Sequence, residues 1–175
     1  MRVLMRSLIV ALVMPATVSA QALGTAEDNL KKKNISLPAP ATPVANYVPA
    51  VQVGSLLFLS GVGPAPSEPR GKIGKDLTLD QGYQAARSTC INLLAATRAA
   101  LGSLDKVKRI VKVLGMVNSS PGFTDQPKVI NGCSDLIVEI FGEAIGKHAR
   151  SAVGMAELPF NIPVEIEMIV EVEAR

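Results

Sequence analysis

The clearest pattern of apolar and polar positions lies at the end of the chain, where side-chain character alternates over residues 164–173. Alternate positions on one side are all apolar: Val164, Ile166, Met168, Val170 and Val172. Four of the five positions between them are glutamate, and the fifth is Ile169. Because successive side chains of a strand point to opposite faces, this segment predicts a β-strand with one buried face and one largely acidic face.

Two longer segments repeat apolar residues at steps of three and four, which predicts amphipathic helices. Thr78 and Gln81 have capping-box spacing at the start of the first helix, and Gly102 can end it. Its apolar side comprises Leu79, Tyr83, Ala86, Cys90, Leu93, Thr97 and Leu101. The second helix starts after Asp125, with Pro127 in its first turn. Its apolar side comprises Val129, Cys133, Leu136, Ile137, Ile140 and Phe141.

Four further segments predict strands: 47–53 and 56–60, joined at Gly54-Ser55 as a hairpin, then 107–117 and 150–157. The resulting order ββαβαββ predicts a single α+β domain, in which one mixed sheet carries both helices on one face. The opposite sheet face is then left without a cover, so it is a candidate surface for oligomer assembly.

The first twenty residues have the pattern of a secretory signal peptide. Arg2 and Arg6 precede an apolar run over 8–13, and small residues at 18–20 offer a cleavage site before Gln21. We therefore predict an exported protein, periplasmic or secreted, with an uncleaved anchor or a disordered extension as the alternatives. The apolar run is too short to span a bilayer. Residues 21–44, rich in proline, are interpreted as an extended tether, and residues 45–175 as the domain.

Charge and cysteine content argue against nucleic-acid binding and against a zinc site. The formal net charge is +3, and two of the positive charges lie in the predicted signal, so the mature chain is close to neutral and no nucleic-acid partner is expected. Two cysteines and one histidine are too few for a zinc site, and no metal or cofactor is predicted. Cys90 and Cys133 are interpreted as buried small residues, with a disulfide between the helices as the alternative.

One arginine and one glutamate on the last two predicted strands suggest a ligand-binding or catalytic site. Arg150 begins the strand over 150–157, and Glu165 lies near the start of the final strand. If these strands pair as a hairpin, the two side chains can meet in one pocket. A guanidinium beside a carboxylate suits a small acidic ligand next to an acid/base group.

With these residues the chain resembles the RidA family, also called YjgF or L-PSP, over residues 35–175. Four landmarks carry the resemblance: Asn46-Tyr47-Val48, Leu59-Ser60-Gly61, His148-Ala149-Arg150-Ser151, and Leu158-Pro159 followed by Val164-Glu165-Ile166-Glu167. The resemblance implies a chorismate-mutase-like fold, a homotrimer, and ligand sites in the clefts between subunits.

Characterised members of the RidA family hydrolyse reactive 2-imino acids to 2-keto acids and ammonia. By resemblance, Arg150 would grip the substrate carboxylate and Glu165 would position a water molecule. Tyr47, Ser60 and Gly61 match cleft positions of the family, and Asn131 lies near a further polar one. The ligand implied is thus a small 2-imino or 2-keto acid.

The sequence also departs from the family. Ala152 stands where many imine deaminases have cysteine, and Val62 stands where they usually have glutamine. A trimeric protein that binds small carboxylates or protects other proteins without turnover is therefore the alternative function, and an endoribonuclease activity is a third. Each site residue also has a structural reading, with Arg150 as an interface ion-pair partner and Ser60 as a turn residue. His148, without an evident nucleophilic partner, is interpreted as a surface residue.

Overall fold

A computed structural model of the chain describes residues 24–40 and 45–174. The described helices are α1 (Ala26–Lys32), α2 (Leu79–Leu101) and α3 (Gln126–Gly146), with short 3₁₀ turns η1 (Leu104–Lys106) and η2 (Pro159–Asn161). The strands are β1 (Ala50–Val53), β2 (Leu56–Val62), β3 (Val107–Asn118), β4 (Ala149–Met155) and β5 (Val164–Val172). The predicted signal over 1–20 lies outside the described residues.

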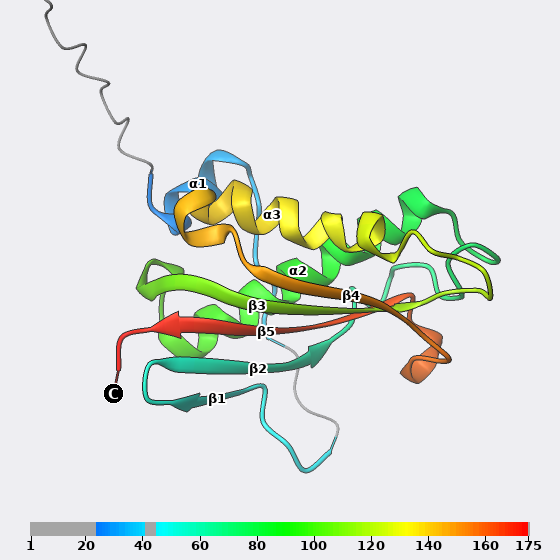
Figure 1. The fold of residues 1–175 in the computed structure, drawn as a ribbon. Helices are drawn as coiled ribbons and strands as arrows, with labels where there is room; N and C mark the ends of the chain where they lie inside the picture. The colour runs from blue at the N-terminus through cyan, green and yellow to red at the C-terminus, as the bar shows by residue number, and fades with distance from the viewer. Residues whose placement is uncertain (1–23, 41–44, 175) are drawn as a thin grey trace, which may run out of the picture.

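The five strands form one mixed sheet in the order β1-β2-β5-β3-β4. β3 and β4 are parallel, and every other neighbouring pair is antiparallel. α2 and α3 lie together on one face of this sheet (Figure 1). The predicted α+β fold, with a mixed sheet and both long helices on one face, is confirmed.

The helix boundaries follow the capping residues. Thr78 accepts a hydrogen bond from the Gln81 amide, and the Gln81 side chain accepts one from the Thr78 amide, which completes the predicted capping box. Gly102 ends α2 in the left-handed conformation, at φ 84°. Asp125 precedes α3 but makes no capping hydrogen bond through its side chain, and its carboxylate pairs instead with Lys128 at 3.1 Å.

The core lies between the sheet and the two long helices. All five alternate apolar residues of β5 that the sequence pattern places on one face are buried: Val164, Ile166, Met168, Val170 and Val172. They pack beneath the buried sides of α2 and α3. The alternation in the sequence therefore marks the face of β5 that the helices cover.

The two long helices approach each other most closely at Gly132 of α3. A Cβ atom placed there would overlap the carbonyl oxygen of Tyr83 and lie 3.1 Å from the amide nitrogen of Arg87, both on α2. Beyond this crossing, the Cys90 thiol contacts the carbonyl oxygen of Cys133 at 3.5 Å. Both cysteines are buried free thiols, and burial raises the pKa of Cys90 well above its usual value. The interpretation as buried small residues is confirmed.

Two expectations from the sequence are wrong. The last two strands do not form a hairpin, because β3 lies between β4 and β5 and pairs with both. The segment interpreted as an extended tether contains a helix, α1, whose Leu30 is buried in the core. Its Glu27 carboxylate accepts hydrogen bonds from Arg98 and from the Leu104 amide, so α1 is joined to the end of α2 and to η1.

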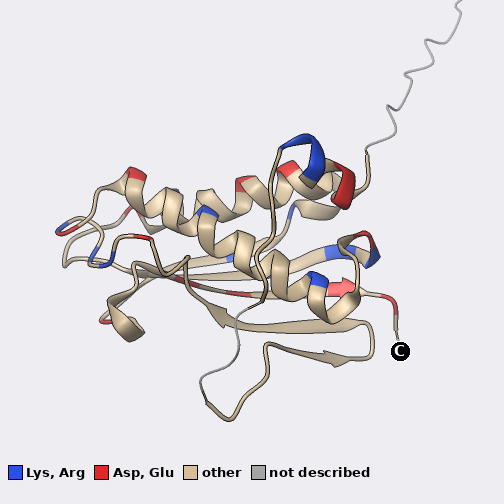
Figure 2. Ribbon diagram, turned by 180° about the vertical axis from the view of Figure 1, so that it is seen from behind, with Lys and Arg blue, Asp and Glu red and all other residues tan. Residues whose placement is uncertain are grey.

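The sheet face opposite the long helices exposes apolar side chains on β1, β2 and β4, whereas the central strand β5 presents Glu165, Glu167 and Glu171 there. Val51, Phe58 and Val153 are 51%, 40% and 39% exposed on β1, β2 and β4. Viewed from behind, the charged residues lie over the helices, the loops and the other strands, whereas β1 and β2 carry none (Figure 2). Exposed apolar side chains on a sheet face are a candidate protein interface.

Candidate functional site

Arg150 lies on the helix-facing side of β4, at the edge of the sheet. Its partner in the parallel register is Val113 of β3, which is fully buried beneath the helices. Directly paired residues of adjacent strands point to the same face, so Arg150 extends toward α3 rather than toward the open face. The helix-facing direction of Arg150 is therefore fixed by strand register.

Two polar residues of α3 hold the guanidinium of Arg150. Its Nη1 donates to Asn131 Oδ1 at 2.8 Å and to Ser134 Oγ at 3.0 Å. Asn131 and Ser134 are three residues apart, on one face of the helix. Within residues 24–40 and 45–174, neither Nη2 nor Nε has a hydrogen-bond partner, and no carboxylate pairs with Arg150. The guanidinium is thus fixed through one nitrogen and keeps its other donors available.

His148 is linked to the same group through Ser134. The Ser134 hydroxyl lies 3.0 Å from His148 Nε2, and His148 Nδ1 lies 2.6 Å from the carbonyl oxygen of Gly146. A carbonyl oxygen only accepts, so Nδ1 carries the proton and Nε2 of the neutral ring accepts from Ser134. Burial, and secondarily the Arg150 charge, lowers the pKa of His148 against the opposing effect of the Gly146 hydrogen bond. The interpretation of His148 as a surface residue without a partner is wrong.

Glu165 lies on the opposite face of the sheet. It alternates with the buried Val164 and Ile166 of β5, and its carboxylate rests against Gly61 of β2. A Cβ atom at Gly61 would overlap Glu165 Oε1 and lie 3.1 Å from Cδ. Among the described residues Glu165 has neither a hydrogen bond nor an ion pair, and burial followed by the nearby Glu167 charge raises its pKa. Such a carboxylate is suited to proton transfer.

Ser60 precedes Gly61 on β2, and Tyr47 lies in the segment before β1. The pairing of β2 with β5 is irregular between Leu59 and Val62, so Ser60 and Gly61 sit in a bulge. The Ser60 hydroxyl donates to the carbonyl oxygen of Val48 at 2.7 Å, and thereby holds the strand that follows Tyr47. Tyr47 itself is half exposed.

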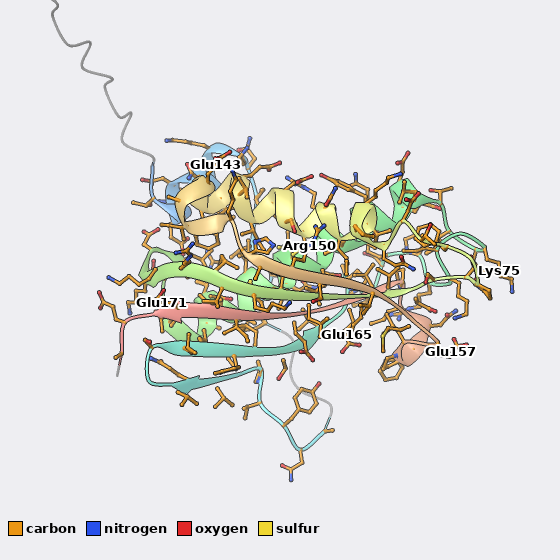
Figure 3. The ribbon with its side chains drawn as sticks, in the orientation of Figure 1. Lys75, Glu143, Arg150, Glu157, Glu165 and Glu171 are labelled. Atoms are coloured by element: carbon orange, nitrogen blue, oxygen red, sulfur yellow. The ribbon has the colours of Figure 1, made fainter. Side chains whose placement is uncertain are left out.

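The candidate residues therefore form two groups. Arg150 and Asn131 make one group on the helix side. Glu165 lies against Gly61 on the other side of the sheet, and Ser60 and Tyr47 belong to the β2 bulge and to the segment before β1. Figure 3 shows Arg150 beside α3 and Glu165 beyond β3, between β5 and β2. The pocket expected to join Arg150 and Glu165 is therefore not formed within one chain.

The described residues contain no group of three or more histidine, cysteine or acidic side chains that could hold a metal ion. None of the described helices is long and apolar enough to cross a membrane.

Comparison with known proteins identifies the family of this chain. Residues 27–172 match the family model described as "YjgF/chorismate_mutase-like, putative endoribonuclease". The chain belongs to the YjgF/RidA family. Its matched region begins inside α1, so the family domain includes most of this helix.

Two relatives and one solved structure are similar to this chain over most of its length. Protein TCP17 of Trypanosoma cruzi is 46% identical over 157 residues, which cover 88% of this chain and 98% of the relative. A 2-iminobutanoate/2-iminopropanoate deaminase of Dermatophagoides farinae is 33% identical, over 81% and 98%. The crystal structure of an Agrobacterium tumefaciens protein of unknown function is 43% identical, over 85% and 92%, with a TM-score of 0.77.

Ser134 is the residue of this YjgF/RidA-family site that sequence reasoning did not find. Two signals were available: Ser134 follows Asn131 by three residues on one helix, and the chain's single histidine stands two residues before Arg150. Neither signal shows that the end of α3 brings His148 back to Ser134.

Proposed function

We propose that this RidA-family protein hydrolyses small 2-imino acids to 2-keto acids and ammonia. The observation that carries the proposal is the state of Arg150, which α3 fixes through Nη1 and which has no acidic partner in the described part of the chain. A guanidinium with two free adjacent nitrogens can bind a carboxylate through two parallel hydrogen bonds. The deaminase relative from Dermatophagoides farinae supports the same substrate class.

In this proposal Glu165 positions the attacking water. A water oxygen adds to the C=N carbon while Glu165 accepts one of its protons. That proton passes to the nitrogen, which gives an amino alcohol. Glu165 then moves the hydroxyl proton of this intermediate to the nitrogen, the C–N bond breaks, and ammonia leaves as the C=O bond forms. The raised pKa of Glu165 suits this exchange, because the protonated carboxyl can return the proton to the leaving nitrogen.

The proposed site lies between subunits of a homotrimer. Arg150 and Glu165 point to opposite faces of one sheet and are separated by β3, so one chain cannot present both to one small substrate. The exposed apolar sheet face, with Val51, Phe58 and Val153, supports burial against other copies. Each site would then combine Arg150 of one subunit with Glu165 of another.

The test is hydrolysis of freshly generated 2-iminopropanoate and 2-iminobutanoate. We expect turnover above the spontaneous rate, a loss of about 10²-fold or more in kcat/KM for Arg150→Ala, and partial activity for Arg150→Lys, which keeps the charge without the paired donors. Glu165→Gln should reduce kcat with a smaller effect on KM. Arg98→Ala is the matched control, because Arg98 pairs with Glu27 at the far end of α2.

Three results would contradict the proposal. Turnover unchanged in Arg150→Ala would remove the carboxylate anchor. An absence of turnover, with small carboxylates still bound in an Arg150-dependent way, would identify a binding protein of the family rather than an enzyme. A monomer by light scattering at assay concentration would rule out the site between subunits.

A further inference from the structure

The hydrogen bonds around Arg150 form a chain with one direction. Arg150 Nη1 donates to Ser134 Oγ, the Ser134 hydroxyl donates to His148 Nε2, and His148 Nδ1 donates to the carbonyl oxygen of Gly146. Each link fixes the next, because guanidinium nitrogens only donate and carbonyl oxygens only accept. A serine hydroxyl that donates to His148 presents a lone pair to Arg150.

A break near the end of α3 brings these hydrogen-bonded residues together. Gly142 adopts φ 73°, which interrupts the helix and leads the backbone through Gly146 to His148. His148 thereby returns to Ser134, which lies 14 residues earlier in the sequence. The ring is half-buried and is held at both nitrogens, so its orientation is defined by backbone and side chain together.

We propose that Ser134 and His148 are positioning residues, which orient the Arg150 guanidinium so that its free N–H groups face the substrate carboxylate. The inference rests on the proposed function, since it concerns the carboxylate anchor of that site. Asn131 fixes the same nitrogen from one side, and the Ser134–His148 pair fixes it from the other. Two hydrogen bonds from Nη1 define the plane of the guanidinium, whereas a single hydrogen bond would leave the plane free to rotate.

The arrangement also makes the anchor sensitive to pH. Protonated His148 would donate from Nε2 to Ser134, so that two cationic groups would point at one hydroxyl oxygen. Arg150 is the charged group that faces the ring. Of the other nearby groups, Lys112 of β3 bonds Ser151 on the opposite sheet face, Lys147 pairs with Glu143 in the exposed turn, and Asp135 accepts from Tyr83 of α2.

The sign of the pH dependence follows from the direction of the shift. The pKa of folded His148 lies below the usual 6.5, so the ring is neutral at pH 7. The chain of hydrogen bonds from Arg150 through Ser134 and His148, called the relay below, is then intact. As pH falls through the lowered pKa, the relay breaks and KM rises. Stability falls as the pH drops from the unfolded pKa, near 6.5, to the lowered folded pKa, because in this range the unfolded histidine binds the proton and the folded one does not.

The experiment compares Ser134→Ala, Ser134→Thr and His148→Gln with the full-length wild type in imine hydrolysis and in calorimetric binding of 2-oxobutanoate. We expect Ser134→Ala to raise KM and the Kd of 2-oxobutanoate about tenfold while kcat changes little, since one charge-assisted hydrogen bond is lost. Ser134→Thr retains the hydroxyl and should restore both. His148→Gln should abolish the rise of KM at low pH. Ser151→Ala is the control, because its hydroxyl serves Lys112 on the other face.

A measurement independent of activity uses the single histidine of the chain. In ¹⁵N-labelled protein, nuclear magnetic resonance should show the Nδ1–H tautomer at pH 7. Arg150→Ala should raise the His148 pKa, since a nearby positive charge is removed. The opposite tautomer, or a His148 pKa that does not respond to Arg150→Ala, would overturn the relay.

The outcomes separate this inference from the proposed function. If Arg150→Ala leaves 2-oxobutanoate binding and turnover intact, the proposed function fails, whatever Ser134 does. If Arg150→Ala abolishes both but Ser134→Ala keeps wild-type KM and pH profile, the anchor stands and the positioning role is wrong.

Discussion

Gly61→Ala is expected to lower kcat/KM for imine hydrolysis about 10²-fold while the Tm stays within about 2 °C of wild type. The added methyl group would occupy the place of Glu165 Oε1. Because a glutamate side chain can rotate away at little cost, the fold should tolerate the change. The carboxylate, however, would leave the position from which we propose that it directs water, and a displacement of about 1 Å is sufficient for such a loss.

Gly63→Ala provides the matched control for Gly61→Ala. It lies two residues further along, where a Cβ atom would meet Ile162 Cδ1, at 2.8 Å, rather than the carboxylate. It should therefore keep nearly wild-type turnover. Equal losses in the two variants, or a full rate in Gly61→Ala, would show that Glu165 does not need the space that Gly61 leaves.

Gly132→Ala is expected to destabilise the fold by about 2–4 kcal/mol, which corresponds to a fall in Tm of roughly 5–15 °C. Here the new Cβ atom would overlap the carbonyl oxygen of Tyr83, and backbone atoms of α2 cannot rotate away as a side chain can. The two long helices would have to separate, which opens the core between them. Thermal unfolding followed by circular dichroism measures the effect.

Gly82→Ala is the control, since it makes the same replacement in the interior of α2. Both substitutions gain about 1 kcal/mol of helix propensity. At Gly82 the nearest atoms are the side-chain ends of Ile73 and Val129, which can move. A small change in Tm is therefore expected there. If Gly132→Ala is as stable as Gly82→Ala, the helices do not depend on close approach at Gly132.

The helices and their ends could be predicted because they depend on neighbouring residues. Capping by Thr78 and Gly102, and the apolar spacing of α2 and α3, are local properties that periodicity reports. Helix α1 also had local signals: Thr25 caps it, acidic residues occupy its first turn and lysines its last. The prolines that follow it led to the interpretation of the whole segment as extended.

The order of the strands in the sheet could not be predicted from such local signals. A short link between β4 and β5 suits a hairpin, but it also suits a connection that passes over one intervening strand. Alternation along β5 predicts which face is buried and says nothing about which strand lies beside it. Because β3 takes the place between β4 and β5, the pocket that the sequence predicts for Arg150 and Glu165 is not formed within a single chain.

The position of Glu165 relative to Arg150 has a genetic consequence. In the proposed trimer, a chain lacking Arg150 and a chain lacking Glu165 are each inactive alone, yet each supplies what the other lacks. Random co-assembly of equal amounts would leave about a quarter of the sites with both groups intact. Two loss-of-function alleles of this gene would therefore complement each other when expressed together, whereas two alleles affecting Arg150 would not.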